Sequence, residues 1–172
     1  MRPIVSVIGD VVARVRAKYD PSEGEKPFYM HGHPLEIVRI LSEMTANGQL
    51  KFKKFPAICL FQDFDEDDNG EGIEADLNIL IIEETKPDFE ASERYQNSFT
   101  PVLYPLFDLF LSEYKKMPGI QLSPANISYT KTDRLYWGRT GLYGNSGNIA
   151  NDFIDAIEIN NLSFRMSRTC QY

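Results

Sequence analysis

The sequence contains few of the residues on which most metal and nucleophilic sites depend. Of its 172 residues, two are cysteines, two are histidines and one is a tryptophan. Cys59 lies inside an apolar run and Cys170 lies far from it in the sequence, so the cysteines do not make a disulfide framework. We expect Cys59 to be a small buried hydrophobic residue.

Long apolar runs and clustered cations are also missing. No run approaches the roughly 20 residues that a membrane-spanning helix needs, so no membrane partner is expected. The first ten residues lack the apolar segment and cleavage site of a signal peptide, which predicts a protein made in the cytoplasm. The 18 Lys and Arg against 25 Asp and Glu give a net charge of −7, which argues against a surface that grips nucleic acid. A negatively charged channel wall would instead let DNA slide past.

Amphipathic segments make up most of the chain. Apolar residues recur at helical spacing in three segments and with an extended pattern in three others. The expected helices cover residues 3–19, 34–46 and 91–116, and the expected strands cover 28–31, 126–136 and 153–166. The apolar face of the third helix begins at Tyr95. Because Pro101 and Pro105 interrupt this segment, we expect two helices there, or one with a kink or a fresh start near Thr100.

The middle of the chain predicts a long β-hairpin. Two runs rich in Ile, Leu and Phe, residues 55–64 and 72–82, flank an acidic turn that contains an Asn-Gly pair. Helices and antiparallel strands follow one another in blocks without regular βαβ alternation. We therefore predict a single α+β domain over residues 1–172, with a mainly antiparallel sheet packed against two to three helices. The hairpin tip, residues 64–73, would project from it.

The acidic turn also matches the beginning of a calcium-binding loop. Asp65, Asp67, Asn69 and Asp76 have the spacing of oxygen ligands around a glycine turn. Against this interpretation, the twelfth position is Asp rather than the longer Glu, and the flanking runs predict strands where that motif has helices. A calcium-responsive protein-binding module is nevertheless one alternative for the function.

The other interpretation of the turn is a charged hairpin tip that keeps a sheet edge from aggregating. Such a tip would face either solvent or the lumen of a channel, where it would repel DNA. Its carboxylates are Asp65, Glu66, Asp67 and Asp68.

The two histidines do not indicate a metal or catalytic site. His31 and His33 would need Cys or carboxylate partners to bind zinc, and the neighbouring sequence suggests none. We expect His33 to begin the helix before Pro34, with Gly32 allowing the turn. No motif places a Ser/His/Asp or Cys/His set, so we predict no catalytic residues and no cofactor. An enzyme whose site combines the histidines with the Glu83 region remains an alternative without a motif.

A glycine-rich loop is expected over residues 137–151. It lacks the Gly-Lys-Ser/Thr ending of a phosphate loop. Cationic and aromatic residues alternate in and before it, as they do at protein interfaces and in single-strand binders. Because the net charge is negative, we favour a subunit or partner interface; the alternative is an ordinary surface loop. The expected interface residues are Arg134, Tyr136, Trp137, Arg139 and Tyr143.

Four segments of the chain resemble proteins from the necks and tails of tailed bacteriophages. They are residues 32–41, 54–63, 93–107 and 155–162. The likeness is to tail-terminator and head–tail connector ring proteins, including those of phages of gut Bacteroidetes. It covers residues 34–165 as a general pattern of elements rather than as a specific site motif.

The resemblance implies a structural protein rather than an enzyme. Its expected partners are further copies of itself, in a six- or twelve-fold ring, together with portal or adaptor proteins and tail proteins. DNA would pass through the ring without specific binding. The expected location is the virion neck or tail, after synthesis in the cytoplasm of the host bacterium. The acidic tip and the glycine-rich loop depart from the family pattern and leave open whether terminator or adaptor is the better description.

Overall fold

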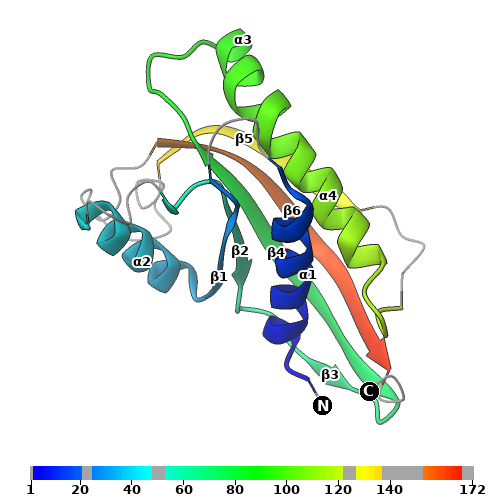
Figure 1. The fold of residues 1–172 in the computed structure, drawn as a ribbon. Coiled ribbons are helices and arrows are strands. Elements are labelled where there is room, and N and C mark those ends of the chain that lie inside the picture. Colours follow the sequence, from blue (N-terminus) through cyan, green and yellow to red (C-terminus); the bar gives the residue numbers. More distant parts are fainter. Residues whose placement is uncertain (1, 21–24, 48–52, 122–126, 137–152, 168–172) are drawn as a thin grey trace.

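One mixed sheet of six strands organises the fold (Figure 1). The computed structural model describes residues 2–20, 25–47, 53–121, 127–136 and 153–167. In chain order the elements are α1 (Ile4–Lys18), β1 (Phe28–Gly32), α2 (Pro34–Ala46), β2 (Ala57–Phe61), β3 (Asp67–Asp68), β4 (Gly72–Glu84), α3 (Ala91–Arg94), the π-helical segment η2 (Tyr95–Leu103), α4 (Tyr104–Lys115), β5 (Ser128–Tyr136) and β6 (Phe153–Ser167). The predicted α+β class is confirmed.

The strands are ordered β1-β2-β4-β6-β5, and β3 pairs with β4 beside β2. Only the pair of β1 and β2 is parallel, and the other pairs are antiparallel. The predicted hairpin is confirmed, because β2 and β3 both pair with β4. The last strand, β6, lies between β4 and β5. It is therefore the penultimate strand of the sheet.

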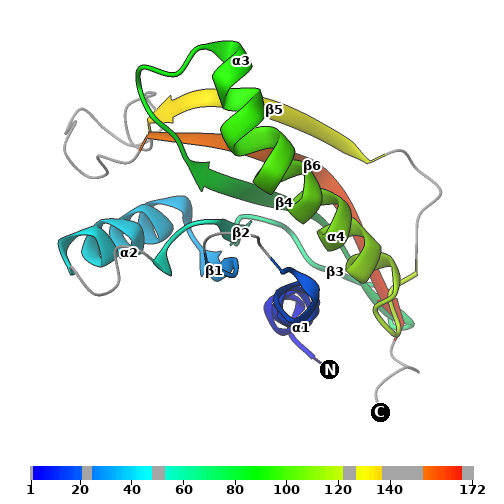
Figure 2. The ribbon, with the colours of Figure 1, turned by 45° about the horizontal axis from the view of Figure 1, so that its top comes forward.

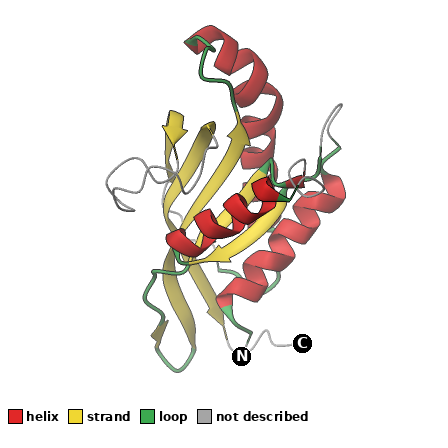
Figure 3. Cartoon of the chain, turned by 90° about the vertical axis from the view of Figure 1, so that its left-hand side faces the viewer, coloured by secondary structure: helices red, strands yellow, loops and turns green. Residues whose placement is uncertain are grey.

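Helices cover both faces of this sheet. Alternate residues of β2 belong to two cores, with Ile58 and Leu60 in the larger and Ala57 and Cys59 in the smaller. The larger core holds α1 and the helix of residues 91–115, whereas α2 packs on the smaller one and crosses in front of the strands in Figure 3. Cys59 is fully buried, as predicted.

The first two helices bury the residues that their spacing selects. Their buried side chains include Ile4, Ile8, Val11, Val12, Val15, Ile37, Val38, Leu41 and Met44. His33 is the N-cap of α2, where its imidazole accepts a hydrogen bond from the backbone N–H of Leu35. Asn47 is the C-cap, directly after the predicted end of the helix at residue 46.

The prolines of the third helical segment are accommodated without a break. Residues 91–115 run along the sheet as one rod (Figure 2), but Tyr95–Leu103 are π-helical. The N–H of Tyr104 reaches the carbonyl of Phe99, five residues back. This wider turn suits Pro101, which has no N–H and would crowd the carbonyl four residues before it in an α-helix. α4 follows directly at Tyr104 with Pro105 in its first turn, so a change of helix type takes the place of the kink or fresh start expected near Thr100.

Candidate functional site

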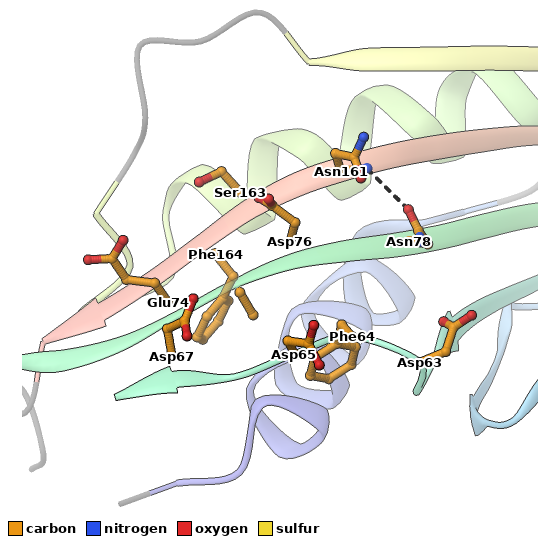
Figure 4. A pocket seen from close by; sticks show the side chains of 11 residues that line it. Asp63, Phe64, Asp65, Asp67, Glu74, Asp76, Asn78, Asn161, Ser163 and Phe164 are labelled. Carbon is orange, nitrogen blue, oxygen red and sulfur yellow. Dashed lines mark hydrogen bonds between the residues drawn. The ribbon is translucent and has the colours of Figure 1, made fainter. Parts of the chain in front are cut away.

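A groove opens in the sheet beside the hairpin arm, the segment that leads from the end of β2 through β3 to the turn before Gly72. β2 pairs with β4 as far as Leu60 and Ile79, and β3 resumes the pairing at Asp67 and Glu74. Between these pairs the arm has residues 61–66, whereas β4 has only residues 75–78. The two extra residues make the arm bow away from β4 and leave a hollow of about 420 Å³. We call it the acidic groove (Figure 4); it is lined by Asp63, Phe64, Asp65, Asp67, Glu74, Ala75, Asp76, Asn78, Asn161, Ser163 and Phe164.

The groove brings together three of the four calcium candidates. Asp65, Asp67 and Asp76 line it, and Asn69 does not. The Asn69 carboxamide instead closes the hairpin turn: Oδ1 accepts from the backbone N–H groups of Glu71 and Gly72 at 3.0 and 2.9 Å. Among the residues that the structure describes, no three His, Cys, Asp or Glu side chains are arranged to hold a metal ion. The calcium-responsive module stays a prediction with one proposed ligand already engaged elsewhere.

A β-bulge shapes the other end of the groove. The register between β4 and β6 shifts between Leu77 and Ile79, so that Asn160 and Asn161 together lie opposite Asn78. Asn161 has φ 54°, a left-handed conformation that Asn tolerates better than most residues. Its backbone N–H donates to Oδ1 of Asn78 at 3.1 Å, the bond drawn in Figure 4.

The hairpin tip is exposed throughout residues 65–71. We define the acidic tip by its carboxylates, which are Asp65, Glu66, Asp67, Asp68 and Glu71. Asp68 Oδ1 accepts from the backbone N–H of Gly70 at 2.9 Å and so helps to form the turn. Beside the tip, Arg165 pairs with Glu74 at 3.0 Å. The tip is thus a concentrated negative charge at one end of the sheet.

The predicted interface residues fall at the end of β5 and beyond it. Arg134 and Tyr136 belong to β5, where Tyr136 pairs with Phe153 of β6. The glycine-rich loop of residues 137–151, with Trp137, Arg139 and Tyr143, lies outside the described residues. Its interface role stays a prediction.

A cationic and aromatic patch appears instead earlier on β5. The ammonium of Lys131 donates to the hydroxyls of Tyr95 and Tyr104 at 2.9 and 3.0 Å and lies 5.4 and 5.6 Å from the centres of their rings. Tyr129, two residues away on the strand, packs against Phe107 with the ring centres 4.6 Å apart and the ring planes tilted by 48°. We call Tyr95, Tyr104, Tyr129 and Lys131 the lysine–tyrosine patch.

Sequence reasoning missed this patch because it placed Tyr95 on the buried face of a helix. Tyr95 is 45% exposed and Tyr129 is 44% exposed, which makes them two of the three most exposed large hydrophobic residues of the described chain. The signal that was available is the alternation of Tyr129 and Lys131 on one face of a predicted strand. Hydrogen bonding to Tyr95 and then to Tyr104 raises the pKa of Lys131, so the cation persists at neutral pH.

A second missed cluster is buried. Arg94 and Asp155 form an ion pair of 3.0 Å with side chains 1% and 0% exposed. The same guanidinium donates to Thr85 Oγ1 and to the carbonyls of Lys86 and Phe89. The available signal was the position of Asp155, which shares its alternation with the core residues of β6. The cluster joins three segments of the fold and has a structural role.

Glu83 lies near this cluster, and the pKa of its carboxyl is strongly raised. Burial first, and then the neighbouring charges of Glu84 and Asp155, raise the pKa of Glu83 to about 8. Its Oε2 is buried and has no hydrogen-bond partner among the described residues. The histidines lie elsewhere, since His33 caps α2 and His31 lies beside Gln62 at 3.3 Å. The structure therefore does not join Glu83 to the histidines through any hydrogen bond or ion pair of the described residues.

Comparison with known proteins adds no family. No protein-family model matches the chain, and no curated protein or solved structure gives a significant match. Among the described residues, no helix is both long and apolar enough to cross a membrane. The function must therefore be argued from the surfaces of this molecule.

Proposed function

We propose that this chain is a structural virion protein that forms a homo-oligomeric ring in the neck or tail of a tailed bacteriophage. In that role it would join portal or adaptor proteins to tail proteins around the DNA channel, without enzymatic activity. The proposal is based on the resemblance of four segments to tail-terminator and head–tail connector proteins. It does not extend to which of these two positions the ring would occupy.

The observation that carries the proposal is the hairpin arm. β3 and the beginning of β4 extend past β2, and the turn between them lies at the far end of the sheet in Figure 1. All of residues 65–71 are exposed, although Asn69 and Asp68 hold them in an ordered turn. An arm that is ordered before it meets a partner loses little entropy on binding, which favours its use in assembly.

The sheet also offers the two unlike surfaces that a ring requires. A cyclic assembly joins one face of each subunit to a different face of the next. The outer strands here are unlike, since β1 has five residues and pairs in parallel, whereas β5 has nine and pairs antiparallel. Opposite edges of this kind support head-to-tail contacts better than a symmetric dimer.

Charge is compatible with a channel that DNA must pass. The acidic groove is lined by the carboxylates of Asp63, Asp65, Asp67, Glu74 and Asp76, and Glu74 pairs with Arg165. A surface of this sign repels phosphates at short range and offers no cluster of cations for DNA to bind. A ring that exposed it to the lumen would let DNA move without adhering.

Light scattering on the purified protein, followed by negative-stain imaging of any large species, tests the proposal. We expect particles of one defined mass and rotational order, either alone or after addition of portal and tail proteins. A protein that remains monomeric at high concentration and ignores both partners would overturn the ring-forming role. Particles of continuously varying mass would indicate aggregation and would count against it equally.

A further inference from the structure

The lysine–tyrosine patch has the chemistry of a binding site for a negatively charged group. Its cation is held in place, because Lys131 donates to two phenolic oxygens that accept without neutralising it. No carboxylate of the described residues lies within ion-pair distance of the Lys131 ammonium. The exposed rings of Tyr95 and Tyr129 add rigid apolar area, which is typical of the energetic centres of protein interfaces.

The complementary surface on the same chain is the acidic tip. Glu66 and Glu71 are both exposed at its end, and neither side chain is needed for the hydrogen bonds that close the turn. The backbone there is fixed by Asn69, so these carboxylates are presented by an ordered arm.

The tip cannot reach the patch of its own subunit. Lys131 pairs with Ile157, which pairs in turn with Ile81 of β4, whereas the tip residue Asp68 pairs with Ile73. The separation along β4 is therefore eight residues, or roughly 26 Å at the rise of a β-strand. In Figure 1 β3 lies at one end of the sheet and α3, next to the patch, lies at the other. Contact between tip and patch must therefore join two copies.

We propose that the acidic tip of one copy binds the lysine–tyrosine patch of the next copy. The inference rests on the ring-forming role proposed above and names its subunit contact. Tip carboxylates would pair with the Lys131 ammonium and displace the solvent over Tyr95 and Tyr129. Tip and patch are different surfaces, and each copy uses one of each. In the head-to-tail arrangement of the proposed ring, the contact propagates from copy to copy until the ring closes.

Nucleic acid is the competing occupant, because single strands also bind cations flanked by aromatic rings. The patch has a single cation among its four residues, and the whole chain carries a net charge of −7. Phosphate binding draws its affinity from several neutralised charges, so a protein carboxylate is the better match.

Charge reversal on each side gives the test, with association measured by sedimentation velocity and images of the particles. Lys131→Glu should weaken association at least tenfold, and so should the double variant Glu66→Lys with Glu71→Lys. An equal mixture of the two should assemble again. In alternating copies one interface keeps its native charges, and at the next interface the two introduced lysines of the tip meet the glutamate introduced at position 131. Lys115→Glu, an exposed lysine of α4 outside the patch, is the matched control and should assemble as the wild type does.

The outcomes separate the contact from the ring itself. Wild-type rings together with unchanged assembly of Lys131→Glu would overturn this contact and leave the ring-forming role standing. A wild type that never assembles, even with portal and tail proteins, would overturn both. Binding of an oligothymidine that is lost in Lys131→Glu, without any change in assembly, would overturn it in favour of nucleic acid. Circular dichroism confirms that each variant is folded, and Lys131→Arg should retain most of the association because it keeps the cation.

Discussion

Arg94 and Asp155 pair at 3.0 Å with both side chains almost completely removed from solvent. Arg94 lies at the start of the π-helical segment and Asp155 near the start of β6, 61 residues later in the chain. The guanidinium also lies 5.1 Å from the centre of the Phe153 ring and donates hydrogen bonds to two loop carbonyls. One side chain therefore joins the third helical segment, the loop after β4 and the sheet.

Removing Arg94 should destabilise the protein strongly. Arg94→Met leaves Asp155 charged and buried without its cation, and we expect a loss of about 3–5 kcal/mol in the free energy of unfolding. The double variant Arg94→Met with Asp155→Leu removes both charges and should be more stable than the single variant. Urea unfolding at pH 7 checks both. Equal stability of the single and double variants would contradict the assigned pairing.

Glu83 should make stability fall as the pH rises. Its pKa is about 8 in the folded protein against 4.5 as the ordinary value, so between these limits the folded state holds a proton that the unfolded state has lost. The contribution is complete below pH 4.5 and declines by up to about 1.4 kcal/mol per pH unit as the pH rises toward 8.

The variant Glu83→Gln isolates this effect because it mimics the protonated carboxyl at every pH. We expect little difference from the wild type near pH 4.5 and a more stable variant, by about 2–4 kcal/mol, at pH 8. Urea unfolding across this range measures the difference. Glu25→Gln, at an exposed position that is not among the charges acting on Glu83, should keep the pH dependence of the wild type. A stability difference between Glu83→Gln and the wild type that does not change with pH would contradict the raised pKa of Glu83.

The spacing of apolar residues along the sequence predicted the elements of this fold well, because the residues at those positions are the ones that are buried. The 3.6-residue repeat predicts the buried stripes of α1 and α2, and two apolar runs around an Asn-Gly turn predict the hairpin. The prediction that Tyr95 lies on the buried face of its helix was wrong. The π-helical turn that begins at Tyr95 is wider than an α-helical turn and changes which side chains face the sheet. The burial of Arg94 could not be predicted, because its ion-pair partner Asp155 lies 61 residues away in the sequence.

The candidate sites depended on relations that a single sequence does not contain. The acidic groove exists because the arm has two more residues than the facing part of β4, which requires the register on both sides to be known. Asn69 matched a ligand position by spacing, yet the turn uses its carboxamide. The lysine–tyrosine patch joins β5 to the third helical segment across 36 residues of sequence.

Gly72 is the residue at which a side chain would do most harm to the arm. A Cβ there would lie 2.4 Å from the carbonyl oxygen of Met166 and 3.2 Å from the Cα of Ser167, both backbone atoms of β6 that cannot turn aside. We expect Gly72→Ala to cost about 2–3 kcal/mol, as overpacking does. Gly70→Ala is the matched comparison: its φ of 82° strains an alanine, but nothing lies within 4 Å. It should cost about 1–2 kcal/mol. Thermal unfolding ranks the two, and the reverse order would contradict the close approach of β4 and β6.

Calcium should leave the stability of the protein unchanged. A ligand that binds only the folded state raises its stability, by about 2.3 kcal/mol when its concentration is fifty times the dissociation constant. Three of the proposed ligands, Asp65, Asp67 and Asp76, line the groove, but Asn69 is held by the turn. Melting temperatures in millimolar calcium and in magnesium at equal ionic strength should therefore agree. A rise specific to calcium that Asp65→Asn abolishes would instead assign the groove as a cation site and revive the calcium-responsive module. The same rise persisting in Asp65→Asn would place the calcium elsewhere on the molecule.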